Sequence, residues 1–168
     1  MRKRPIIVFL LAVIVISAFL LGIRFTEKGQ IRQMISNGQL LCNMYPVNTY
    51  LSDEDYCIAI FENGEPIKCV VFSETRQPIR SIGIKPVTNF EFQHYLGQSL
   101  TEIENEFGAY HVDIGSGYFM PSYITLDGYL VSFTFMAEDE EVTQIGKTDL
   151  FTGESIEWIL TNEEGQYQ

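Results

Sequence analysis

Three polar residues near the middle of the chain are of the types that carry nucleophilic catalysis. His111, Asp113 and Ser116 could supply a base, a group that orients the base, and a nucleophile. His111 and Asp113 alternate on one expected strand, so their side chains share a face. Ser116 follows in a loop that lacks a nucleophile-elbow pattern, and the spacing does not fix the geometry of a triad. We therefore assign no catalytic residue and keep an enzyme that uses His111 and Asp113 as an alternative.

Two acidic runs could hold a cation. Residues 53–55 and 138–141 are rich in carboxylates, but neither has the alternating spacing and central glycine of a calcium loop. We interpret both as solvated turns and keep a weak cation or small-ligand sensor as a second alternative. With two histidines and no paired His or Cys spacing, the sequence predicts no metal site and no cofactor. The loop 115–117 has no following lysine and opens no helix, so it lacks the parts of a phosphate cradle.

Aromatic residues cluster around the same loop, and their chemistry favours binding over catalysis. Aromatic side chains that are exposed on a sheet or loop act as anchors for protein partners. The candidate binding residues are Tyr118, Phe119 and Tyr123, with Ser116 beside them in the loop.

Cys42, Cys57 and Cys69 are too few for a disulfide scaffold, and their number is odd. A turn at Asn63-Gly64 separates Cys57 from Cys69. A two-residue loop there places the two sulfurs on opposite faces, whereas a three-residue loop sets them directly opposite each other. Pro66 disturbs either register. We expect buried thiols without a bridge.

The elements that position these residues are clearest between residues 97 and 150. Ser99 and Glu102 have the spacing of a helix capping box, and Gly108 provides a left-handed stop. Between them runs one apolar stripe: Leu100, Ile103 and Phe107. The dipeptide Asp127-Gly128 then predicts a two-residue hairpin turn that pairs Ile124 with Val131. This register places six residues on one side of the sheet: Ile124, Leu126, Tyr129, Val131, Phe133 and Phe135.

Other segments follow the same logic. A hairpin with apolar residues on both faces is expected over residues 56–72, which implies that both of its sides are covered. Residues 40–51 suggest one short irregular strand. Residues 81–85 suggest another strand, and Asn89 caps a helical turn over residues 90–96 that places Phe92 and Leu96 near the core. The remaining expected strands are 110–114, 118–126, 129–136 and 142–151. The tail from Gly153 either docks or frays.

The helix and its caps follow the pattern Gly97-x-Ser99-x-x-Glu102-Ile103-x-x-x-Phe107-Gly108. With three antiparallel strands after it, this pattern resembles the helix-plus-sheet module of the β-lactamase-inhibitor-protein-like and outer-membrane-assembly lipoprotein families. The run DIGSGYFMPSYITLDGY also resembles membrane-anchored proteins of Gram-positive bacteria. The resemblance covers residues 88–152 and implies a non-enzymatic envelope domain that binds another protein. The chain departs from these families because it has one copy of the module and no lipid-bearing cysteine after the apolar run.

The N-terminus is typical of a membrane anchor. Three basic residues precede an unbroken apolar run over residues 6–23, and a helix of that length spans about 27 Å at about 1.5 Å per residue. A cleaved secretory signal is the competing interpretation, but the run is long and no small-x-small cleavage pattern follows it. The basic start holds this end in the cytoplasm, so the rest of a single-pass protein lies outside.

Charge restricts the partners of that outer part. All 22 acidic residues, but only 8 of the 11 basic ones, lie beyond the apolar run. The resulting negative charge repels nucleic acid and the surface of anionic lipid, so neither is an expected partner. We interpret the charge as a means of solubility.

The sequence thus predicts an α+β protein with short helices packed on a mainly antiparallel sheet. Its expected parts are a transmembrane anchor (1–23), a juxtamembrane linker or short helix (24–39), an extracytoplasmic domain (40–152, with the module at 97–150) and a C-terminal tail (153–168). The expected function is non-enzymatic binding of a protein or cell-wall partner at the bacterial cell envelope.

Overall fold

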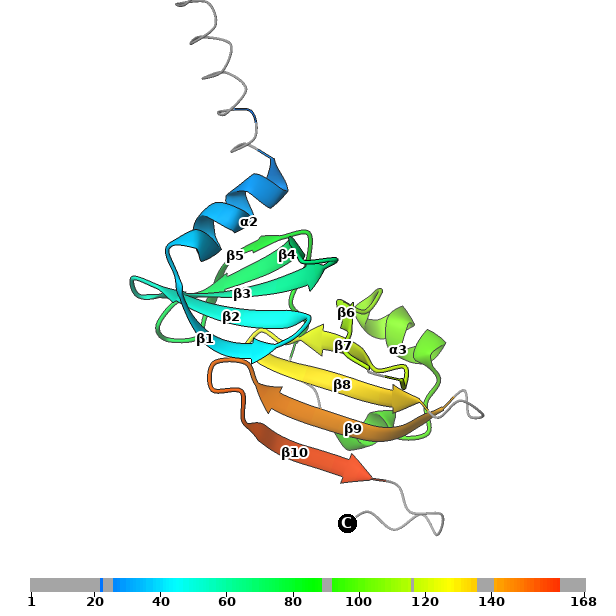
Figure 1. The fold of residues 1–168 in the computed structure, drawn as a ribbon. Coiled ribbons are helices and arrows are strands. Elements are labelled where there is room, and N and C mark those ends of the chain that lie inside the picture. Colours follow the sequence, from blue (N-terminus) through cyan, green and yellow to red (C-terminus); the bar gives the residue numbers. More distant parts are fainter. Residues whose placement is uncertain (1–21, 23–25, 89–91, 116, 136–140, 161–168) are drawn as a thin grey trace, which may run out of the picture.

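The computed structural model describes residues 22, 26–88, 92–115, 117–135 and 141–160. Two five-stranded antiparallel sheets form the body, with helix α2 (Glu27–Ser36) packed on the first and helix α3 (Leu100–Phe107) on the second (Figure 1). The predicted α+β class is confirmed, with two sheets in place of one. Apart from Gly22, the predicted anchor lies outside the described residues, and no helix within the described part is long and apolar enough to cross a bilayer.

The first sheet is a meander in which each strand pairs with the next. Residues 40–51 form two strands around a turn at Tyr45-Pro46, whose peptide bond is cis, and not the single predicted strand. The predicted hairpin around Asn63-Gly64 is confirmed. The strand predicted at 81–85 begins earlier, at Pro78. In order, the strands are β1 (Gln39–Met44), β2 (Val47–Ser52), β3 (Asp55–Glu62), β4 (Glu65–Phe72) and β5 (Pro78–Ile82).

Helix α2 covers the outer face of this sheet. The Thr26 hydroxyl caps it by accepting a hydrogen bond from Gly29 N at 3.1 Å. Ile31 is fully buried, and Met34 and Ile35 pack beside it. Of the two possibilities for residues 24–39, the structure has the short helix, because this weak apolar stripe finds a sheet face on which to pack.

The second sheet has the order β10-β9-β8-β7-β6. Of the strand predicted at 110–114, only Val112 and Asp113 pair with the next strand. The segment after Gly153 pairs with β9 as far as Leu160, so the tail adds an edge strand. The strands are β6 (Val112–Asp113), β7 (Pro121–Ile124), β8 (Tyr129–Phe135), β9 (Val142–Asp149) and β10 (Ser155–Leu160).

Helix α3 begins and ends as predicted. Ser99 Oγ accepts a hydrogen bond from Glu102 N at 3.3 Å, and Glu102 Oε2 accepts one from Ser99 N at 2.8 Å, which completes the capping box. Gly108 ends the helix with a φ of 80°. The apolar stripe packs on the second sheet through fully buried Ile103, flanked by Leu100 and Phe107.

The helical turn expected over residues 90–96 is the 3-10 helix η1 (Phe92–Tyr95). Tyr95 is buried in the core beneath α3, and Leu96 packs beside that core as predicted. Asn89, which was expected to cap this turn, and the side chain of Phe92 lie outside the described residues.

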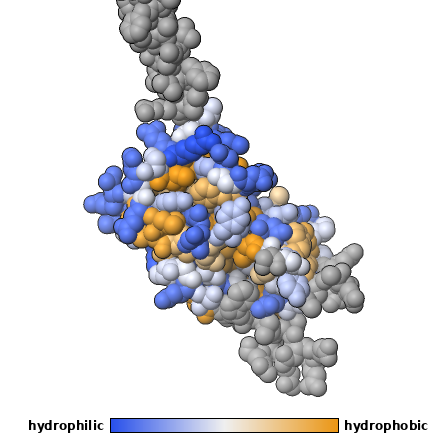
Figure 2. All heavy atoms as spheres, in the orientation of Figure 1, coloured by the Kyte–Doolittle hydropathy of each residue, from blue (hydrophilic) through white to orange (hydrophobic). Residues whose placement is uncertain are grey.

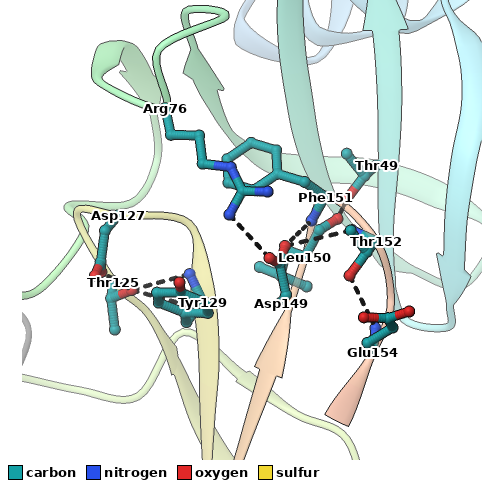
Figure 3. A network of polar contacts seen from close by, with 10 residues as sticks. All are labelled: Thr49, Arg76, Thr125, Asp127, Tyr129, Asp149, Leu150, Phe151, Thr152 and Glu154. Atoms are coloured by element: carbon teal, nitrogen blue, oxygen red, sulfur yellow. Dashed lines mark hydrogen bonds and ion pairs between the residues drawn. The ribbon is translucent and has the colours of Figure 1, made fainter. Parts of the chain in front are cut away.

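The hairpin between β7 and β8 differs from the prediction by one residue. Ile124 pairs with Leu130, and Tyr123 pairs with Val131. The turn contains three residues because the Thr125 hydroxyl accepts a hydrogen bond from Tyr129 N at 3.0 Å (Figure 3). Gly128 is the last residue of the turn and has a φ of 82°. A three-residue loop that combines a type I turn with a bulge needs a residue of positive φ at this place.

This register divides the six residues predicted to share one face. Val131, Phe133 and Phe135 belong to the core beneath α3, whereas Ile124 belongs to the core between the sheets. Leu126 is 40% exposed. Both faces of this sheet are buried, so apolar alternation does not discriminate between the two registers.

The two sheets pack face to face around a shared core. The first sheet contributes Val47, Ile58, Ile60, Val70 and Phe72, and the second contributes Val112, Ile124, Leu130, Leu150 and Phe151. The predicted cover on both sides of the β3–β4 hairpin is confirmed, because its other face lies under α2.

Polar contacts also join the sheets, at the end of β9 (Figure 3). Arg76 donates to Asp149 Oδ2 at 2.9 Å, and its guanidinium lies 4.4 Å from the centre of the Phe151 ring. Thr49 Oγ1 donates to the carbonyl of Leu150 at 2.5 Å.

All three cysteines are buried and unbridged. The loop at Asn63-Gly64 has two residues, but the register shifts by one between Ile60 and Phe61. Cys57 therefore opposes Val71, and Cys69 opposes Ala59. The sulfurs consequently share a face, which corrects the prediction that a two-residue loop separates them.

Candidate functional site

The loop between β6 and β7 presents aromatic side chains to solvent. Tyr118 is 60% exposed and Phe119 is 37% exposed. Both were predicted as binding residues, and the structure exposes both of them. Ser116, the polar member of the predicted set, lies outside the described residues.

Asp113 holds this loop in shape. Its Oδ1 accepts hydrogen bonds from Gly115 N and from Met120 N, each at 2.9 Å. The Ile114 N–H donates to the Met120 carbonyl at 3.2 Å across the base of the loop. A single carboxylate oxygen thus joins Gly115 and Met120 on the two sides of the loop.

Gly115 is required by the close approach of the backbone. A Cβ at this position would lie 1.6 Å from the carbonyl oxygen of Tyr118. Since no side chain fits in that space, the loop conformation depends on glycine at position 115.

Phe119 is anchored on one side while part of its ring stays exposed. Its ring centre lies 5.7 Å from that of Tyr110 and 5.9 Å from that of Phe135. Its carbonyl also accepts a hydrogen bond from Phe135 N at 3.2 Å. Phe119 therefore packs the loop against Tyr110 and Phe135. Tyr118 has the larger exposed surface of the two, so more of it can contact a partner.

Tyr123 does not join this surface. It is fully buried, its hydroxyl donates to the Gly108 carbonyl at 2.8 Å, and burial raises its pKa. The prediction that Tyr123 binds a partner is wrong, because the register of β7 turns its side chain into the core beneath α3.

His111 and Asp113 have separate structural roles. His111 is 8% exposed, and its Nδ1 accepts a hydrogen bond from Ile124 N at 2.9 Å. Burial, with the nearby charge of Lys68, lowers the pKa of His111 to about 4, so the ring is neutral near pH 7. Asp113 is exposed and bonds the loop. The Nδ1 lone pair is already engaged, which is the opposite of what a general base requires.

The acidic runs show no cation site in the described part of the chain. Residues 53 and 54 form the β2–β3 turn, where Asp53 has a φ of 54°, and Asp55 begins β3. Of residues 138–141 only Glu141 is described. Among described residues, no group of three or more His, Cys, Asp or Glu side chains is arranged around a common point.

One surface feature was missed by sequence reasoning. A groove of about 580 Å³ runs beside β5, where Ile79 is 57% exposed, and extends to Leu126 and to the end of α3 at Phe107. Arg80 and Lys85 bring positive charge to it, and Glu106 brings negative charge. The groove is lined by residues of β5, of the segment 85–88, of the end of α3 and of the β7–β8 turn, which lie far apart in the sequence, so no local sequence pattern encodes it.

Comparison with known proteins adds no identification. No family model, no curated protein and no solved structure matches this chain.

Proposed function

We propose that the chain is a non-enzymatic binding module of the bacterial cell envelope, anchored in the membrane by residues 6–23 and contacting a protein or cell-wall partner through the loop that carries Tyr118 and Phe119. The basic residues before the apolar run support this orientation, with the folded domain outside the cell. The resemblance of residues 88–152 to protein-binding envelope modules agrees with the proposal.

The observation that carries the proposal is an exposed aromatic pair in a segment whose two sides are joined by Asp113. Tyr118 exposes 60% of its surface, while Asp113 already bonds the amides on both sides of it. Hydrogen bonds that already join the two sides of a binding segment reduce the conformational entropy that is lost in a complex, and tyrosine is among the residues enriched at binding hot spots. An enzyme that uses His111 and Asp113 is supported less well, because both side chains are engaged with backbone amides.

The test is crosslinking in intact cells followed by mass spectrometry of the proteins that remain attached. Tyr118→Ser is expected to reduce capture of the main partner at least about tenfold, since loss of a hot-spot residue costs about 2 kcal/mol or more. The matched control is Tyr45→Ser, because Tyr45 is 65% exposed on the distant β1–β2 turn.

The proposal is contradicted if both variants capture the same proteins as the native chain. It is also contradicted if Tyr45→Ser loses the partner and Tyr118→Ser keeps it. Melting temperatures of the purified variants identify any general loss of folding.

A further inference from the structure

Two buried thiols meet beneath helix α2. Cys57 on β3 and Cys69 on β4 are diagonal neighbours on one face of the first sheet, because each opposes the residue two places from the other. Cys57 is 3% exposed and Cys69 is fully buried. Both belong to the cluster that includes Ile31 of α2.

A third sulfur-bearing residue packs against the cluster that holds this pair. Met34 of α2 packs against the same cluster, and it lines a pocket of about 450 Å³ together with Cys57. The pocket gives ions a route to Cys57, and Asp53, Asp55 and Arg80 also line it, so it carries charges of both signs. The positive charge of Arg80 acts on Cys69.

The two thiols are electronically distinct. The Cys57 thiol donates a hydrogen bond to the Cys69 sulfur, which lowers the pKa of Cys69, with a further contribution from the charge of Arg80. The same hydrogen bond and burial raise the pKa of Cys57.

The spacing of the strands favours a bridge longer than a disulfide. Diagonal neighbours in an antiparallel pair have Cα atoms about 7–8 Å apart. A disulfide usually needs about 4.4–6.8 Å. A disulfide joins the two sulfurs by one S–S bond, whereas a bound metal ion joins them by two metal–sulfur bonds. This longer link suits the diagonal spacing without movement of the strands.

We propose that Cys57, Cys69 and Met34 form a binding site for a soft monovalent ion, Cu(I). Two thiolates and a thioether are the donors that select Cu(I) over harder cations. Binding displaces two thiol protons, so that Cu⁺ and two S–H groups give one anionic dithiolate complex and two H⁺, with no change of oxidation state. Arg80 offsets the negative charge of that complex.

The experiment uses the full chain in detergent micelles, reduced and kept free of oxygen, with Cu(I) alone as the probe and a chromophoric chelator as the competitor. The native chain is expected to take up one Cu(I) ion. Copper X-ray absorption is expected to show a shell of two or three sulfur atoms.

Cys57→Ser and Cys69→Ser are each expected to weaken Cu(I) binding roughly 100-fold or more, since loss of a ligand exceeds the 10- to 100-fold effect of outer-shell changes. Met34→Leu keeps the size of the side chain and is expected to weaken binding less. Cys42→Ser is the matched control, because Cys42 is a buried cysteine outside this cluster, and it is expected to bind as the native chain does.

Three results would overturn the proposal. One is a copper shell of nitrogen or oxygen alone in the native chain, a readout that needs no variant. Another is equal Cu(I) affinity in the native chain and Cys57→Ser. The last is no uptake of Cu(I) by the native chain while its three thiols remain reduced.

Discussion

At the scale of single residues, His111 works as a hydrogen-bonding part of the core. Its Nδ1 accepts from the backbone of Ile124, and its ring lies 5.3 Å from that of Tyr123. The Lys68 ammonium donates to the His111 carbonyl at 3.0 Å, which brings a positive charge near the ring and opposes its protonation. The sequence identified His111 as notable for its chemistry, but burial gives it a structural role.

Burial of His111 predicts a pH-dependent stability. Its pKa is about 4 in the folded chain against an ordinary value of 6.5, so the folded state binds the proton more weakly than the unfolded state. The stabilisation is complete above pH 6.5 and is lost as the pH falls toward 4. Between pH 7 and pH 5 the free energy of unfolding is expected to fall by about 2 kcal/mol from this group.

Urea unfolding at the two pH values measures this difference. His111→Gln, which keeps an acceptor for Ile124 N, is expected to show a smaller fall. An unchanged fall in His111→Gln would show that other groups cause the pH dependence.

Gly115 offers a test of the binding loop. Gly115→Ala places a methyl group against the Tyr118 carbonyl, so the loop must open and the bond from Met120 N to Asp113 is broken. We expect a loss of about 1–3 kcal/mol in stability. Hydrogen exchange at Met120 N is expected to accelerate more than exchange within α3, and unchanged protection of Met120 N would contradict the loop geometry.

At the scale of elements, the sequence predicted the features that depend only on residues close together in the chain. The capping box of α3 and the turn at Asn63-Gly64 are interactions between residues close in sequence, and both are confirmed. The register of the β7–β8 hairpin depends on the Thr125 hydroxyl and on Val87, whose carbonyl accepts from Leu126 N at 2.8 Å. Val87 lies far from the turn in sequence, so the Asp127-Gly128 pattern alone predicted the wrong register.

The capping box also predicts the contribution of Ser99. Ser99→Ala removes the acceptor for Glu102 N and is expected to lower the free energy of unfolding by about 1 kcal/mol. Thr101→Ala, at an exposed position of the same helix, is the matched control and is expected to change stability little. Chemical denaturation of both variants measures the difference, and equal stabilities would show that the cap contributes little.

At the scale of the whole molecule, the two sheets are stacked. Helix α2 packs on the first sheet, and the loop that carries Tyr118 and Phe119 belongs to the second. Figure 2 shows hydrophilic residues gathered over α2, with smaller hydrophobic areas on the strands below it. The sequence predicted one sheet, because each strand shows only that its faces are apolar and not which partner covers them. The groove beside β5 and the diagonal pair of thiols, Cys57 and Cys69, depend on contacts between segments that are far apart in the sequence. The sequence alone therefore does not predict them.

The most direct test of the proposed outward-facing module uses the burial of its own thiols. Cys42, Cys57 and Cys69 are 7%, 3% and 0% exposed, so the native chain gives little background with a membrane-impermeant maleimide. Tyr118→Cys places a thiol at the tip of the loop. If the loop faces outward, intact cells are expected to label this variant as fast as lysed cells do, while the native chain stays nearly unlabelled. Labelling of Tyr118→Cys only after lysis would contradict the proposed outward-facing topology.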